Sequence, residues 1–182
     1  NSAGALAHPD ARRSLVRAGI ALYGISPGPG VAHRAAGLRP AMSLRARVSH
    51  VKAVAAGSNV SYGWRHRFER DTTLATLPIG YADGVPRRLG TLPDRPGGDV
   101  LIGGHRCPIV GVVTMDQLTV DVAPVVDAGG QVAVGDEAVL LGAQGDERIG
   151  ADEWADRLGT IAYEIVCSIG ARVPRRVLGG DS

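Results

Sequence analysis

The strongest constraint on the fold is a series of short apolar segments between residues 42 and 142, interrupted every few residues by Gly, Pro or Asp. Segments of this length, separated by residues that favour turns, are typical of β-strands joined by tight loops. Many short strands at close spacing favour a small β-barrel or β-sandwich. The predicted strands lie at 42–56, 72–80, 99–103, 106–114, 117–122 and 136–142.

The first predicted strand changes phase along its length. Leu44, Ala46 and Val48 alternate with polar residues, and the next apolar residue of the strand is then Val51, one position out of step. A shift of one residue in a two-residue repeat predicts a β-bulge.

The two ends of the chain are predicted to be helical. Residues 9–18 begin with Pro and Asp and stop at Gly19, so they predict a helix, and the apolar run 20–24 predicts a buried strand after it. Residues 26–40 contain too many Pro and Gly residues for an element and predict a domain boundary. Near the C-terminus, 152–158 predicts a helix that ends at Gly159, followed by isoleucines at helical spacing, namely Ile161, Ile165 and Ile169.

Composition narrows the class of protein. A chain of 182 residues that is 45% hydrophobic can bury a core, and a net charge of +2 without a long single-sign run gives little support for a nucleic-acid partner. No apolar run reaches the roughly 20 residues of a membrane span. Cys107 and Cys167 have no metal-binding spacing, so we expect free thiols in the core and a cytoplasmic protein. The five histidines show no HxxxH or HxH pattern, so no metal site is expected.

Two further features concern the chain as a whole. Lys52 is the only lysine, so the other 19 of the 20 basic residues are arginines. The chain also begins at Asn1 rather than at a methionine, from which we expect a piece of a longer protein.

Three segments carry residues with chemical potential. Ser2, Arg17 and the turn at Gly19 could bind a phosphate, although a capped helix end explains them equally well. Tyr62 lies in a turn close to several cations and could act as a general base, or it could be a packed corner residue. The segments 80–84 and 115–117 are each explained as turns when taken alone.

Taken as an ordered set, the motifs resemble the bacterial alanine racemase family over essentially the whole chain. They are Asn1-Ser2-Ala3, Val16-Arg17-Ala18-Gly19-Ile20-Ala21-Leu22-Tyr23-Gly24, Val60-Ser61-Tyr62-Gly63, Gly80-Tyr81-Ala82-Asp83-Gly84, Met115-Asp116-Gln117, Ile161-Ala162-Tyr163-Glu164-Ile165 and Arg172-Val173-Pro174-Arg175. The resemblance implies two parts. Residues 1–36 would be the C-terminal end of a TIM-type β/α barrel that binds pyridoxal 5'-phosphate (PLP), and residues 40–182 would be a mainly β C-terminal domain with a short C-terminal helix.

The resemblance also implies roles for single residues. Ser2, Tyr163 and the backbone amides at Gly19 and Ile20 would hold the cofactor phosphate, and Asn1 would also bind the cofactor. Arg17 would face the pyridine nitrogen and leave it unprotonated. Tyr62 would be one acid/base, and the Met115 amide would bind the substrate carboxylate. Tyr81, Arg87 and Asp116 would line the corridor through which L- or D-alanine enters.

The same resemblance implies a homodimer in which Tyr62 serves the site of the other subunit, in an enzyme that supplies D-alanine for peptidoglycan. The second acid/base, a lysine that holds PLP covalently, would lie outside this chain, because Lys52 matches no cofactor motif. Val112 departs from the family, which has an arginine there that lines the corridor. Two alternatives remain at this point: a broad-specificity amino-acid racemase, and a non-catalytic β-barrel module whose arginines bind an acidic ligand.

Overall fold

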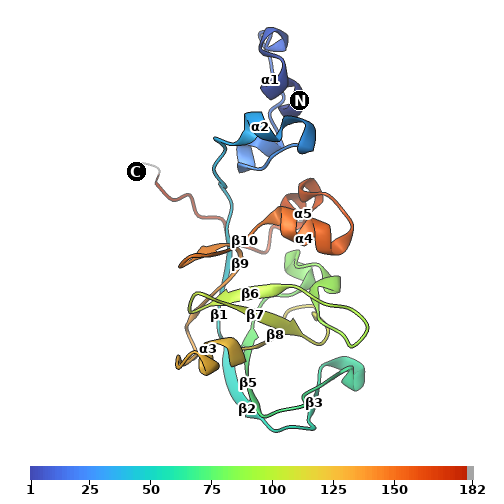
Figure 1. Cartoon of the computed structure of the whole chain (residues 1–182), viewed down its shortest axis with the longest axis vertical. Helices are drawn as coiled ribbons and strands as arrows, with labels where there is room; N and C mark the ends of the chain where they lie inside the picture. Colours follow the sequence, from blue (N-terminus) through green and yellow to red (C-terminus); the bar gives the residue numbers. More distant parts are fainter. Residues whose placement is uncertain (180–182) are drawn as a thin grey trace.

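The computed structural model describes residues 1–179, and most of its strands form one antiparallel sheet (Figure 1). The sheet runs in the order β1-β9-β6-β7-β8-β5-β2, with β10 added to β9. Its strands are β1 (Leu44–Arg47), β2 (His50–Val54), β5 (Thr72–Leu77), β6 (Asp99–Ile102), β7 (His105–Val110), β8 (Leu118–Asp121), β9 (Glu137–Gln144) and β10 (Glu147–Ile149). The predicted mainly β architecture is therefore confirmed.

The two ends of the sheet order, β1 and β2, are separated by only two residues. Backbone hydrogen bonds continue through this link on both sides, because Val48 N–H donates to Asp136 O at 2.9 Å and Ser49 N–H donates to Thr76 O at 2.9 Å. One stretch of chain thus joins β9 at one end of the order to β5 at the other, which curls the sheet into a small barrel. The prediction of a single strand over 42–56 was wrong, because the phase change marks the point where the chain exchanges one neighbour for another.

Three short strands and several short helices were not predicted. β3 (Asn59–Val60) pairs with β4 (His66–Arg67), and β10 has only three residues, so none is long enough to show alternation. The 3₁₀ helices η4 (Tyr62–Trp64), η5 (Tyr81–Asp83) and η6 (Arg87–Leu89) lie in the loops between strands, and α3 (Ala123–Asp127) follows β8.

The N-terminal prediction was wrong in its details. The helix α1 spans Ser2–Ala7, whereas 9–18 contains only the 3₁₀ turn η1 (Pro9–Ala11). Leu15 is 80% exposed, so no apolar face drives a helix there. The predicted strand at 20–24 is the 3₁₀ helix η2 (Ile20–Tyr23), because no other described strand lies beside it to form a ladder.

The segment before the sheet continues with η3 (Pro29–Val31) and the single-turn helix α2 (Ala32–Ala35), inside the predicted boundary at 26–40. No strand lies among residues 1–40, so a β/α barrel is not evident in this chain. In Figure 1 the segment lies beyond the helical end of the sheet and reaches it through one extended stretch.

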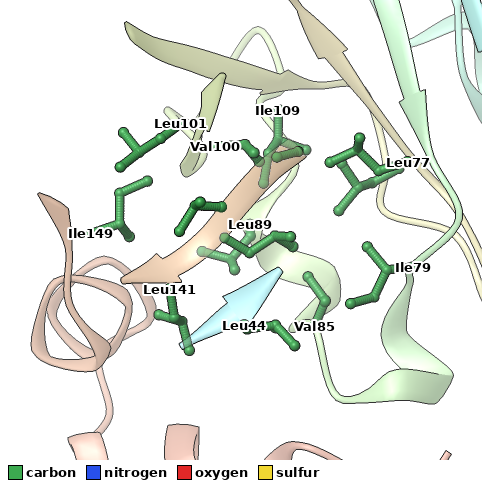
Figure 2. Packing of buried hydrophobic residues seen from close by; sticks show 14 of the residues in the cluster. Leu44, Leu77, Ile79, Val85, Leu89, Val100, Leu101, Ile109, Leu141 and Ile149 are labelled. Carbon is green, nitrogen blue, oxygen red and sulfur yellow. The ribbon is translucent and has the colours of Figure 1, made fainter. Parts of the chain in front are cut away.

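The core fills the interior of the barrel and its helical end. Figure 2 shows side chains from β1, β5, β6, β7, β9 and β10 pointing toward one another, with Leu89 and Val85 from the intervening loop between them. Leu77, Leu101 and Ile109 are completely buried. Their burial accounts for the alternation in the sequence, since each strand turns one face inward.

Two C-terminal helices cover that end of the barrel. The predicted helix is confirmed as α4 (Ala151–Leu158), which ends at Gly159 with φ 70°. The helix α5 (Ala162–Ser168) follows and buries Ile165, and Ile169 at its end is also buried. Ile161 is 59% exposed because it precedes the helix, so the predicted apolar stripe begins one turn later.

An ion-pair network fastens α4 to the sheet. Arg106 on β7 bonds Glu147 and Glu153, each at 2.8 Å, and Arg157 bonds Asp99 at 3.2 Å. Burial acts to raise the pKa of Glu153, but hydrogen bonds and charge from Arg106 and Arg157 outweigh it, so that pKa is lowered. Glu153 therefore stays ionised at neutral pH, and its ion pair with Arg106 holds α4 against β7.

No helix in residues 1–179 is long and apolar enough to cross a membrane.

The two tryptophans give a matched test of this core. Trp154 on α4 is fully buried, whereas Trp64 is 77% exposed. We expect Trp154→Ala to lower the free energy of unfolding by about 3–5 kcal/mol, because it leaves a large cavity between α4 and the sheet. Trp64→Ala should change it by less than about 0.5 kcal/mol. Urea denaturation followed by far-ultraviolet circular dichroism measures both, and equal effects would contradict this packing.

Candidate active site

A first pocket lies where the N-terminal segment meets α5. Its volume is about 470 Å³, and its lining residues are Asn1, Ser2, Arg17, Ala18, Gly19 and Tyr163. Five of the six residues predicted to bind the cofactor line it together. The sixth, Ile20, follows Gly19 and is buried in the core at 2% exposure, where it anchors the turn.

The floor of this pocket offers hydrogen-bond donors. Ser2 is 3% exposed, and its hydroxyl oxygen accepts the Ala21 N–H at 3.2 Å, which leaves the hydroxyl proton to donate elsewhere. The N–H groups of Gly19 and Ile20 open η2 and have no acceptor within residues 1–179. The Asn1 side chain instead accepts the Gly4 N–H at 2.9 Å, so it caps α1.

These groups fit a phosphate ester. Two unpaired amides and a hydroxyl provide donors at this turn, and Tyr163 lines the pocket from α5. Arg17 supplies a cation and forms no ion pair with any described residue. The pocket therefore has the donors that the phosphate of PLP requires, with a guanidinium beside them.

A second pocket surrounds Tyr62. Its volume is about 390 Å³, and its lining residues are Ser61, Tyr62, Gly63, Trp64, Val112, Thr114, Gln117, Leu118 and Thr119. The Tyr62 side chain is 75% exposed, and that of the neighbouring Trp64 is also solvent-facing. The interpretation of Tyr62 as a corner residue packed under Trp64 is therefore wrong.

Ser61, the residue before Tyr62, has a strained backbone and is held by hydrogen bonds to Val112. Ser61 has φ 70°, a left-handed conformation that costs free energy in a residue other than glycine. Its hydroxyl accepts the Val112 N–H at 2.7 Å and donates to Val112 O at 3.3 Å. Gly111 allows this approach, since a Cβ there would lie 2.4 Å from the Ser61 Cβ. The turn that carries Tyr62 is thus tied to the loop after β7.

The charges near Tyr62 come from arginines. Arg65 and Arg67 are exposed on either side of His66. Burial lowers the pKa of His66, while the charge of Asp121 opposes this more weakly, so the imidazole is neutral at pH 7. The ring of His66 packs edge to face against the ring of Phe68, with 4.7 Å between the ring centroids. His66 therefore has a packing role beside the pocket.

A third group of predicted residues meets at the loops after β5 and before β8. Tyr81 N–H donates to Thr114 O and Ala82 N–H donates to Met115 O, each at 3.0 Å. Gly80 permits this contact, because a Cβ there would lie 2.2 Å from Thr114 O. Tyr81 and Met115 are 43% and 53% exposed, so both remain accessible beside each other.

Arg87 and Asp116, the other two residues predicted to line the corridor, lie in or next to these loops. Arg87 is exposed at the start of η6 and forms no ion pair with any residue that the structure describes. Asp116 bonds Arg172 Nη2 at 2.6 Å, and Arg172 Nε lies 3.3 Å from Asp83. The pKa of Arg172 is raised by the hydrogen bond to Asp116 and by the charge of Asp83. Sequence reasoning gave Arg172 no role, because the residues that it joins lie far apart in the chain.

The first two pockets are not brought together within one chain. They share no lining residue. In Figure 1 the segment that includes α1 and α2 lies at one end of the molecule, whereas β3, which leads directly to Tyr62, lies at the other. Lys52 on β2 lines neither pocket. No three His, Cys, Asp or Glu side chains within the described range could hold a metal ion.

Comparison with known proteins identifies the family. The model of "Alanine racemase, C-terminal domain" matches residues 41–177. The chain belongs to the alanine racemase family. Among curated relatives, the alanine racemase of Symbiobacterium thermophilum is 50% identical over 182 residues, which are 100% of this chain and 45% of that protein. That of Frankia casuarinae is 49% identical over 177 residues, 97% of this chain and 44% of that protein.

Solved alanine racemase structures have the same fold. The enzyme from D-cycloserine-producing Streptomyces lavendulae matches with a TM-score of 0.82 at 45% identity, covering 98% of this chain and 44% of that one. The enzyme from Streptomyces coelicolor A3(2) matches with a TM-score of 0.83 at 41% identity, with the same coverage. The chain thus spans less than half the length of these alanine racemases, and the matches include the N-terminal segment that lines the first pocket.

The prediction of free thiols in the core is confirmed for Cys107 and wrong for Cys167. Both are free thiols, but only Cys107 is buried, whereas Cys167 on α5 is exposed. Burial, followed by the charges of Asp121 and Asp99, raises the pKa of Cys107 to about 12. Almost no thiolate forms there at ordinary pH, and the thiolate is the reactive species.

We therefore expect one thiol of the native chain to react with Ellman's reagent at pH 8 and both to react after denaturation. The Cys167→Ser variant should give no rapid reaction until it is unfolded, since only Cys107 remains. The absorbance of the released thiol measures the count. Rapid reaction of the native Cys167→Ser chain would show that Cys107 is accessible.

Proposed function

We propose that this chain is the C-terminal part of a PLP-dependent alanine racemase, a cytoplasmic enzyme that interconverts L- and D-alanine and supplies D-alanine for peptidoglycan. The complete enzyme is the polypeptide in which this chain is joined to the remainder of the family's length. The observation that carries the proposal is that the residues of the first pocket, which suit a phosphate, and Tyr62 occur within a chain of this family.

In this proposal the first pocket holds PLP, in a segment that completes the family's β/α barrel. Ser2, Tyr163 and the amides at Gly19 and Ile20 bind the phosphate, for which the two unpaired N–H groups give the best support. Arg17 faces the ring nitrogen and keeps it without a proton, because a guanidinium stays charged and has no lone pair to accept one. When bound, PLP acts as an electron sink that makes the α-proton of the amino acid acidic.

Tyr62 is the acid/base on one face of the substrate. Its phenolic oxygen takes the α-proton of L-alanine or returns a proton to make L-alanine, depending on direction. Inversion needs a second group on the opposite face, because one oxygen cannot reach both faces of a planar carbon. We assign that role to a lysine outside this chain, since the only lysine here is Lys52 on an exposed part of β2.

We further propose that Tyr62 serves the site of a second subunit in a homodimer. Two observations support this proposal. The pocket of Tyr62 is separate from the pocket of Ser2 and Arg17, and Tyr62 is exposed beside an exposed tryptophan. In a two-fold dimer each subunit both gives and receives the same residues. The Met115 amide binds the substrate carboxylate, and Tyr81, Arg87 and Asp116 line the corridor to the site.

One test of this proposal uses the chain alone. Purified residues 1–182 should show no interconversion of L- and D-alanine, because neither the covalent anchor for PLP nor the second acid/base is present. The complete enzyme, supplied with PLP, should racemise alanine. Chiral chromatography of alanine after incubation measures both. Racemisation by the pure chain, or an inactive complete enzyme that folds and binds PLP, would contradict the proposal.

Another test changes Tyr62 in the complete enzyme. Tyr62→Phe keeps the ring but removes the ionisable oxygen, so PLP absorbance should persist while turnover falls about 10²–10⁴-fold. The loss should be larger from L to D, the direction in which the tyrosine abstracts the proton. Chiral chromatography and exchange of the α-proton in D₂O give the two rates.

Trp64→Phe is the matched control, since it also changes one exposed aromatic residue in the same turn without removing an acid/base. Its turnover should stay within a few-fold of the parent enzyme. Mixed dimers of Tyr62→Phe subunits with subunits that lack the barrel lysine should regain activity, because both lesions fall in one composite site. Unchanged turnover and proton exchange in Tyr62→Phe would overturn the assignment.

A further inference from the structure

Arg172 joins two turns that carry predicted site residues. It lies just beyond α5, where its Nη2 bonds Asp116 Oδ1 at 2.6 Å and its Nε lies 3.3 Å from Asp83 Oδ1. Asp83 belongs to η5 with Tyr81, and Asp116 follows Met115. A single guanidinium therefore links the Tyr81 turn to the Met115 turn through two different nitrogen atoms.

The two carboxylates differ in how firmly they are held. Asp83 is 8% exposed, and its Oδ2 accepts the Gly80 N–H at 2.9 Å while its backbone oxygen accepts the Gly170 N–H at 3.0 Å. The Asp116 side chain is 57% exposed and has no other partner among residues 1–179. Arg172 thus connects a fixed carboxylate to an otherwise free one.

The Met115 turn is closed by two hydrogen bonds, in which the Thr114 N–H and the Thr114 hydroxyl donate to Gln117 O at 2.9 Å and 2.8 Å. Its carbonyl oxygens at Thr114 and Met115 accept N–H groups from Tyr81 and Ala82, each at 3.0 Å. The N–H of Met115 itself has no acceptor in the described chain. These bonds hold the two ends of the turn, whereas the Asp116 side chain at its tip has Arg172 as its partner. Without Arg172 the peptide between Met115 and Asp116 loses its side-chain restraint, and the direction of the Met115 N–H becomes more variable.

We propose that Arg172 is a positioning residue that fixes the Met115 backbone N–H by clamping Asp116 to Asp83. This inference rests on the proposed function, in which that N–H binds the carboxylate of alanine. The Arg172–Asp116 half of the clamp acts by orienting the turn rather than by stabilising the fold, since an ion pair between side chains that are 55% and 57% exposed contributes little to the free energy of unfolding. Asp83, whose side chain is only 11% exposed, keeps the Gly80 N–H as a partner of its Oδ2 when Arg172 is removed.

A contact to the substrate carboxylate is equally present in the bound substrate and in the transition state, so its loss raises KM and leaves kcat nearly unchanged. In the complete enzyme, Arg172→Ala should raise the KM for alanine about tenfold, the scale of losing most of one hydrogen bond to a charged group. Its kcat should change less than about twofold. Initial rates over a range of alanine concentrations separate the two constants.

Three further variants test the clamp itself, and a fourth is a control. Asp116→Asn should raise KM by a similar factor, and the double variant with Arg172→Ala should be no worse than either single one, because all three break the same contact. Arg172→Lys should recover only part of the loss, because one ammonium cannot bond both carboxylates with separate nitrogens. Arg176→Ala removes the same charge from the same tail, where it has no described ion pair, and should leave KM unchanged.

Hydrogen exchange provides a readout that does not depend on racemisation. Amide exchange at Tyr81 and Ala82, followed by NMR or mass spectrometry, should accelerate in Arg172→Ala and in Asp116→Asn, but not in Arg176→Ala. If exchange and KM are both unchanged in Arg172→Ala and Asp116→Asn, the clamp is wrong. If exchange accelerates while the parent complete enzyme has no racemase activity, the proposed function fails and the clamp stands. An Arg172→Ala chain that does not fold would contradict the orienting role, and Asp116→Asn still tests the contact.

Discussion

Leu77 at the end of β5 pairs with Leu118 at the start of β8, and this register decides which loops meet at the site. Because the strands are antiparallel, the loop that leaves β5 and the loop that enters β8 emerge at the same edge. Tyr81 and Met115 are thereby brought side by side across 34 positions of sequence, and two backbone hydrogen bonds join their turns. A slip of one residue in either strand would turn its leucine out of the core, so the packing that stabilises the barrel also fixes this part of the site.

The Tyr62 turn depends on a different kind of restraint. Its backbone at Ser61 is strained, and β3 and β4 beneath it pair over only two residues each. Such a short ribbon does not hold a turn by itself. The Ser61 hydroxyl supplies the missing restraint through both backbone groups of Val112, and Val112 is buried against the barrel. Because this contact uses only the backbone N–H and O of Val112, the side chain at that position can differ without changing how Tyr62 is positioned.

Sequence reasoning succeeded where the pattern is local and failed where it depends on neighbours. The strands near 72–80 and 136–142 and the helix at 152–158 were predictable, because a run of apolar residues and a terminal glycine are signals within the segment itself. The segment 20–24 was not, since a strand requires a partner and none of the described strands lies beside it. In the same way, the motifs indicated the residues that line the first pocket. The link between Arg172, Asp83 and Asp116 joins three separate loops, so no pattern of spacing in the sequence could predict it.

The exposed aromatic residues support the proposal that the two pockets form one site in a dimer. Tyr62 and Trp64 are more than 70% exposed on a rigidly anchored turn, although burial of such rings is strongly favourable. The first pocket, by contrast, is open and is lined by a turn whose N–H groups are unpaired within residues 1–179. The exposed rings of the Tyr62 turn need a surface that buries them, and the first pocket needs a group that closes it. Contact between the Tyr62 turn of one subunit and the Ser2 pocket of another would bury the rings and complete the pocket at once, so the same surface would provide both the stability of the dimer and its second acid/base.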